Sequence, residues 1–92
     1  MSEPNPTALP KRPRINKLFR LQWEQVQQAH VLLYPEGMVQ LNTSAAEILK
    51  RCDGEHTVDE IIVELQDVFN EPDLRDPIEG MLRAAFDNDW IT

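Results

Sequence analysis

Side chains that could do covalent or metal chemistry are few in this sequence. It contains two histidines, His30 and His56, and one cysteine, Cys52. Their spacing supplies no set of three or four metal ligands, and the three glycines stand too far apart to form a phosphate-binding loop. Cys52 lies on the apolar side of a predicted helix, where a buried thiol stays protonated and unreactive. The sequence therefore predicts no catalytic residue, no metal site and no cofactor, which indicates that the protein is not an enzyme.

The acidic residues are numerous but show no general acid–base pair. Most of those between positions 59 and 89 lie opposite apolar stripes, as solvated helix faces do. Residues 21–92 hold four basic residues against fifteen acidic ones, whereas five of the nine basic residues lie in the first twenty positions. A body with this charge repels a phosphate backbone, so we expect no nucleic-acid binding by the folded part.

Length and composition indicate one small domain. The chain has 92 residues, and no apolar run approaches the length of a membrane helix. No secretory signal is visible, and the single cysteine has no partner for an internal disulfide, so a cytoplasmic protein without membrane contact is expected. Residues 1–14 contain four of the seven prolines and few large apolar side chains, which predicts a disordered basic arm before a domain over residues 15–92.

Three short strands are predicted in the first half of the domain. From Phe19 to Glu24 apolar and polar residues alternate, the pattern of a half-buried strand. Residues 31–34 are apolar on both faces, as in a central strand, and residues 38–41 form the next short run. The turn sequence Tyr34-Pro35-Glu36-Gly37 joins these two runs as a β-hairpin.

Helical spacing begins after Leu41. Asn42, Thr43 and Ser44 supply cap candidates for a first helix, and Ser44 with Glu47 fits a capping box. Gly54 can take the left-handed conformation that ends this helix. Thr57 and Glu60 fit the same motif for a second helix, which the stretch 70–72 stops.

The start of the third helix has two candidates. Asp73 could cap it, or Asp76 could do so with Pro77 at the first helical position. The order strand, strand, strand, helix, helix, helix gives an α+β fold, in which a three-stranded antiparallel sheet precedes three helices as in winged-helix-like domains.

The residues Met38–Leu41 offer a possible interaction surface. If this strand lies at a sheet edge, it is short and carries neither charge nor proline, so an extended peptide could add to it by main-chain hydrogen bonds. Alternatively, the third helix, the N-terminal arm or a second subunit could cover the same edge.

Several motifs resemble one known family. The run Leu32–Asn42, with the sequence LLYPEGMVQLN, is followed by Cys52-Asp53-Gly54, Thr57-Val58 and Trp90-Ile91 at matching spacing. Over about residues 14–92 the sequence resembles PqqD proteins, the peptide chaperones of pyrroloquinoline quinone (PQQ) biosynthesis. No family signature is visible before residue 14.

The resemblance implies a function and a site. PqqD proteins bind the precursor peptide PqqA and deliver it to the radical SAM enzyme PqqE, and the same fold serves as a recognition element in other peptide-modifying pathways. The leader peptide is then expected as an added strand along the third strand and against the third helix. On this sequence the implied peptide-binding residues are Met38, Val39, Gln40, Leu41, Arg75, Ile78, Met81, Leu82 and Ala85.

Three other interpretations stay open at this point. A winged-helix nucleic-acid-binding protein fits the helix order, although the second helix contains no Lys or Arg. A small enzyme would need a nucleophile and base that are not evident. A homodimer could pair its sheet edges or exchange elements across the turn Pro35–Gly37.

Overall fold

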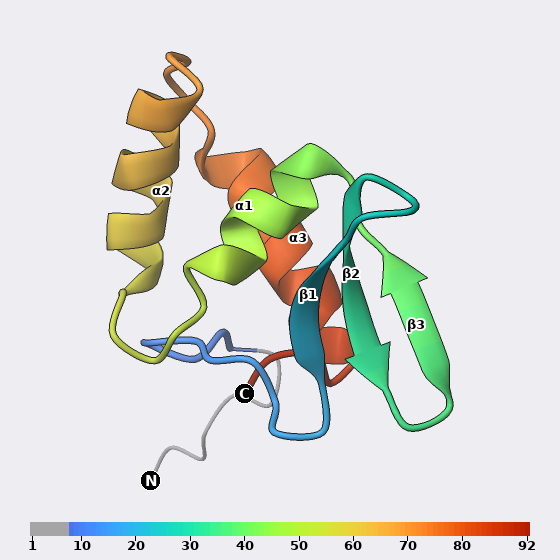
Figure 1. The fold of residues 1–92 in the computed structure, drawn as a ribbon. Helices are drawn as coiled ribbons and strands as arrows, with labels where there is room; N and C mark the ends of the chain where they lie inside the picture. The colour runs from blue at the N-terminus through green and yellow to red at the C-terminus, as the bar shows by residue number, and fades with distance from the viewer. Residues whose placement is uncertain (1–7) are drawn as a thin grey trace, which may run out of the picture.

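The computed structural model describes residues 8–92 and has three strands followed by three helices (Figure 1). These elements are β1 (Arg20–Glu24), β2 (Ala29–Tyr34), β3 (Gly37–Gln40), α1 (Thr43–Lys50), α2 (Val58–Val68) and α3 (Arg75–Asp87). The predicted α+β class and the predicted order of elements are confirmed. None of the helices in the described part of the chain is long and apolar enough to cross a membrane.

The sheet is antiparallel, with β2 in the centre and β3 at one edge. Tyr34 pairs with Gly37 across the two-residue turn at Pro35 and Glu36, as the hairpin prediction requires. Both Val31 and Leu32 of β2 are fully buried, which agrees with a central strand covered on its two faces. Trp23 is 49% exposed because it lies in the other edge strand, β1, against the ring of His30.

The N-cap residue of α1 lies two residues before Ser44, the residue of the predicted capping box. Asn42 is the N-cap residue, and its side-chain oxygen accepts a 2.7 Å hydrogen bond from the Ala45 N–H. The Ser44–Glu47 capping box was therefore wrong, and Glu47 instead forms ion pairs with Lys50 and Arg51. Helix α1 ends at Lys50, so Gly54 (φ 80°) shapes the following loop rather than the helix end.

Helix α2 begins as predicted and α3 does not. Thr57 accepts a hydrogen bond from the Glu60 N–H while Glu60 accepts one from the Thr57 N–H, which is the expected reciprocal cap. Helix α3 begins at Arg75 after Leu74, which makes no side-chain cap hydrogen bond, so neither Asp73 nor Asp76 is the cap.

One apolar core joins the sheet to the three helices. The apolar stripes of the three helices supply most of it, and Leu32, Leu41 and Ile91 complete it. In Figure 1 the helices lie together on one side of the sheet, with β3 on the far side of β2 from β1. The buried members are Leu32, Leu41, Ala45, Ala46, Ile48, Leu49, Cys52, Ile61, Ile62, Leu65, Ile78, Leu82, Ala85 and Ile91.

The two ends of the domain are tied together. Arg14 and Thr92 exchange backbone hydrogen bonds of 3.1 and 2.8 Å, and the Ile15 N–H donates to the Cys52 carbonyl. Pro13 is fully buried. Of the arm predicted to be disordered over residues 1–14, residues 1–7 lie outside the described part. Residues 13 and 14 pack on the body, because these backbone bonds supply stabilisation that the arm's side chains lack.

Candidate functional site

The free side of β3 presents backbone hydrogen-bonding groups. The Leu41 N–H donates to the His30 carbonyl at 2.9 Å, so Leu41 faces β2, and from there toward the turn every second residue also faces β2. In an antiparallel ladder the residues of one strand point their N–H and C=O groups alternately toward and away from the partner. Val39 therefore pairs with β2, whereas the N–H and C=O groups of Met38 and Gln40 point to the open side of the sheet. No strand within residues 8–92 pairs with that side.

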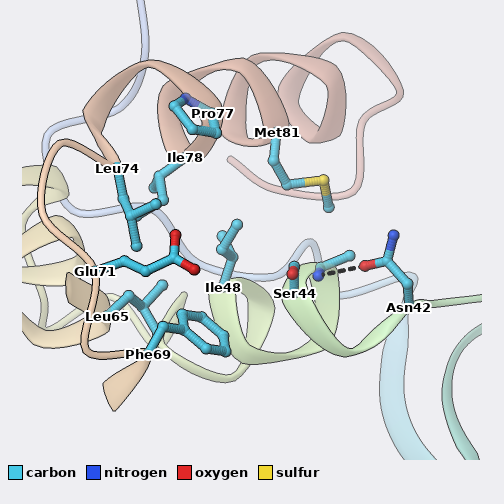
Figure 2. Close-up of a pocket in the computed structure, with 11 residues that line it drawn as sticks. Asn42, Ser44, Ile48, Leu65, Phe69, Glu71, Leu74, Pro77, Ile78 and Met81 are labelled. Atoms are coloured by element: carbon cyan, nitrogen blue, oxygen red, sulfur yellow. Dashed lines mark hydrogen bonds between the residues drawn. The ribbon is translucent and has the colours of Figure 1, made fainter. Parts of the chain in front are cut away.

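An apolar pocket begins where β3 ends. It has a volume of about 260 Å³ and lies between the first turns of α1, the end of α2, the α2–α3 connection and the first half of α3 (Figure 2). Asn42, two residues beyond β3, lines the pocket, so the chain passes from the end of β3 into the pocket wall. We call it the α1–α3 pocket; its lining residues are Asn42, Ser44, Ala45, Ile48, Leu65, Phe69, Glu71, Leu74, Pro77, Ile78 and Met81.

The strand residues implied by the family resemblance differ in accessibility. Met38 is 45% exposed and Gln40 is also exposed, whereas Val39 is half-buried and packs against the core. Leu41 is buried. Only Met38 and Gln40 thus combine an accessible side chain with outward backbone groups.

The helix residues implied by the resemblance fall into two groups. Ile78 and Met81 line the α1–α3 pocket, and Figure 2 shows both pointing toward α1. Leu82 and Ala85 have no exposed surface and belong to the core. Arg75 does not line the pocket, because its guanidinium binds Asp59 at 3.0 Å and Glu79 at 2.9 Å. Ile78 and Met81 therefore share the pocket, whereas Arg75, Leu82 and Ala85 lie outside its lining, which also contains no residue of β3.

Sequence reasoning missed most of the pocket. Phe69 and Leu74 flank the α2–α3 connection, where a hydrogen bond from the Leu74 N–H to the Gln66 side chain (3.1 Å) folds the chain back toward α2. Phe69 ends the apolar stripe of the second helix, so the available signal was Leu74, a large apolar residue in the connecting loop that neither helical stripe requires. The meeting of Phe69 and Leu74 with Ile48 of α1 depends on helix packing, which no local pattern encodes.

The side chains that could react or bind a metal have structural roles. Burial raises the pKa of the Cys52 thiol to about 12, so it stays protonated. His56 contacts Asp53 at 3.0 Å and Glu64 at 3.2 Å, and hydrogen bonding to His56 lowers the pKa of Asp53 to about 2. These contacts fasten the α1–α2 loop to α2. Within residues 8–92 no group of three or more His, Cys, Asp or Glu side chains is arranged to hold a metal ion.

Helix α2 presents an acidic face. Asp59, Glu60, Glu64 and Asp67 are exposed along it, and it has no basic residue. This arrangement opposes the nucleic-acid interpretation, because a winged-helix protein must bring basic side chains to the phosphates.

Comparisons with known proteins agree with each other. The family model described as coenzyme PQQ synthesis protein D (PqqD) matches residues 29–91. Relatives named "PqqA binding protein" include that of Azotobacter vinelandii, 43% identical over 92% of this chain and 94% of its own length. Another, from Methylococcus capsulatus, is 42% identical over 84% of this chain and 83% of its own length.

A solved structure shares the fold. The solution NMR structure of the PqqD truncation of Methylobacterium extorquens PqqCD, described as a functional and stand-alone RiPP recognition element, has a TM-score of 0.71. It is 29% identical to this chain, and the match covers 95% of this chain and 97% of the other. The family match over most of the domain, the identity to relatives along nearly their whole length and the shared fold show that this chain belongs to the PqqD family of coenzyme PQQ synthesis proteins.

Proposed function

We propose that this protein is a non-catalytic chaperone that binds the precursor peptide PqqA as an added strand on β3 and presents it to the radical SAM enzyme PqqE. The names of its relatives support PqqA as the ligand. The observation that carries the binding mode is the open edge of β3, which has outward backbone groups at Met38 and Gln40 and ends two residues before Asn42 of the α1–α3 pocket.

The two parts of the site have different tasks in this proposal. The outward N–H and C=O groups of Met38 and Gln40 set the register of the peptide without requiring a particular sequence. The pocket then takes a peptide side chain against Ile78 and Met81, and this contact selects among sequences. Arg75 is already engaged by two carboxylates, so we no longer expect it to pair with the peptide.

Presentation to PqqE requires no chemistry from this chain. A chaperone that holds the peptide and the enzyme together raises the local concentration of substrate at the enzyme, which increases the rate without a catalytic group. The buried thiol of Cys52 and the paired His56 agree with a protein that leaves catalysis to its partner.

Binding mode is tested by NMR titration of labelled protein with PqqA, using two variants at one position. Gln40→Pro removes an outward N–H, whereas Gln40→Ala removes the same side chain and keeps the N–H. We expect Gln40→Pro to weaken binding about threefold to tenfold, as for a lost backbone hydrogen bond, and Gln40→Ala to change it little. Equal affinities of the two folded variants, or shifts clustered away from β3 and the pocket, would reject strand addition.

The partner is tested separately. Size-exclusion chromatography of the protein with PqqE, with and without PqqA, should show a complex in both cases. If PqqE displaces PqqA, the two share a site and the presentation model is wrong. Light scattering over a concentration series tests the homodimer, in which the β3 edges would pair with each other and compete with the peptide.

A further inference from the structure

One charged side chain lies in the lining of the α1–α3 pocket. Of the eleven lining residues, Glu71 is the only ionised one, and the others are mainly apolar. Figure 2 shows the Glu71 carboxylate extending over the pocket between Leu74 and Phe69. Within the described part of the chain, no hydrogen bond or ion pair engages this side chain.

Several carboxylates near the helices have partners. Glu47 and Glu64 pair with Arg51, and Glu79 pairs with Arg75. Other unpaired acids, such as Asp67, are exposed on helix faces outside this pocket. Glu71 alone combines an unpaired carboxylate with a place in the wall of this pocket.

A guest side chain must therefore satisfy two kinds of surface. A purely apolar guest would remove water from the carboxylate without replacing its hydrogen bonds, which costs free energy. An acidic guest would be repelled. A guest with an apolar stem and a cationic end packs its stem on Ile48 and Phe69 while its charge meets Glu71.

We propose that the α1–α3 pocket selects a cationic group on an apolar stem, with Glu71 as the residue that determines this specificity. The inference rests on the proposed peptide-binding function and specifies the ligand chemistry of that site. The cation is either a Lys or Arg side chain of the bound peptide or the ammonium group of its N-terminus.

The test measures PqqA affinity by isothermal titration calorimetry for the wild type, Glu71→Gln and a matched control, Asp67→Asn. Asp67 is also exposed and unpaired and lies four residues from Glu71, so its loss reports the general effect of charge. We expect Glu71→Gln to weaken binding about twofold to fivefold more than the control, the range of a solvent-accessible ion pair. Because Glu71 is exposed, both variants should keep the fold, which circular dichroism checks.

The peptide is then varied to locate the cation. One series replaces each Lys and Arg of PqqA by Gln in turn, and another peptide has an acetylated N-terminus. The effect of Glu71→Gln should vanish for the one peptide that lacks the cation bound by Glu71, because this peptide has already lost the interaction. The effect should persist for the other peptides.

Two results would overturn the inference and leave the proposed function standing. In the first, the wild type binds PqqA and Glu71→Gln binds it equally or more tightly. In the second, Glu71→Gln weakens binding, but none of the peptide changes removes this effect. Absence of PqqA binding by the wild-type protein would instead reject the proposed function, and this inference with it.

Discussion

Two glycines should respond in opposite ways to the same substitution. Gly54 has φ 80°, in the left-handed region, and a Cβ atom placed on it would lie 2.5 Å from Nη2 and 2.9 Å from Cζ of Arg14. Gly80 lies inside α3 on the exposed surface, and a Cβ atom placed there would meet nothing within 4 Å. Gly54→Ala therefore forces a side chain into a strained backbone, while Gly80→Ala only removes conformational freedom from the unfolded chain.

The magnitudes follow from these environments. The backbone strain at Gly54 costs about 1–3 kcal/mol of unfolding free energy. The guanidinium of Arg14 is the end of a flexible side chain and must move away, although the Arg14 backbone can keep its hydrogen bonds to Thr92. Gly80→Ala should instead stabilise the protein by about 0.8–1 kcal/mol. In a domain of this size each kcal/mol corresponds to about 4–8 °C in Tm.

Urea unfolding followed by circular dichroism measures both changes. Arg14→Ala, alone and combined with Gly54→Ala, separates the two costs: the clash disappears in the double variant and the backbone strain stays. Equal stability of Gly54→Ala and wild type would refute the reasoning, as would a loss of stability in Gly80→Ala.

Three further outcomes are expected. Hydrogen bonding to Asp53 and attraction to Glu64 raise the pKa of His56. The stabilisation that the protonated His56 gives the folded protein is therefore fully present below pH 6.5 and is lost as pH rises through the raised pKa. Urea unfolding should show this loss in the wild type and not in His56→Gln, and the same pH dependence of the unfolding free energy in both proteins would contradict it. Cys52 should react with a water-soluble thiol reagent only after unfolding, and prompt labelling of the native protein would show that its burial is incomplete. Leu82→Ala should cost about 2–5 kcal/mol of unfolding free energy, and a small loss in chemical denaturation would place Leu82 outside the core.

The fold was predictable because its signals are local. Alternation marked β1, the turn at Pro35 marked the hairpin, and the reciprocal cap of Thr57 and Glu60 marked the start of α2. The start of α1 was ambiguous because Asn42 and Ser44 are both good caps. Leu41 decides between them, since its hydrogen bond to His30 and its burial end the strand immediately before Asn42.

The start of α3 depends on contacts that are distant in sequence. Leu74 is held by Gln66 of α2 and lies in the α1–α3 pocket, so the helix begins after it although two aspartates nearby are better caps. For the same reason the sequence could not divide the apolar stripe of α3 into pocket and core. Ile78 and Leu82 share that stripe and are both buried in the core, but only Ile78 also lines the pocket.

The open edge alone is too short to hold a peptide. Met38 and Gln40 offer four outward backbone groups, and each hydrogen bond contributes about 0.5–1.5 kcal/mol net. Ordering each peptide residue opposite β3 costs about 1–2 kcal/mol of backbone entropy, so pairing along this strand of four residues roughly cancels. The surplus must come from side chains buried in the α1–α3 pocket, where one large apolar stem contributes about 1.5–3 kcal/mol. In the proposed function, therefore, the edge would determine register and the pocket affinity, and a short uncharged edge of this kind could stay open without pairing with every extended chain it meets.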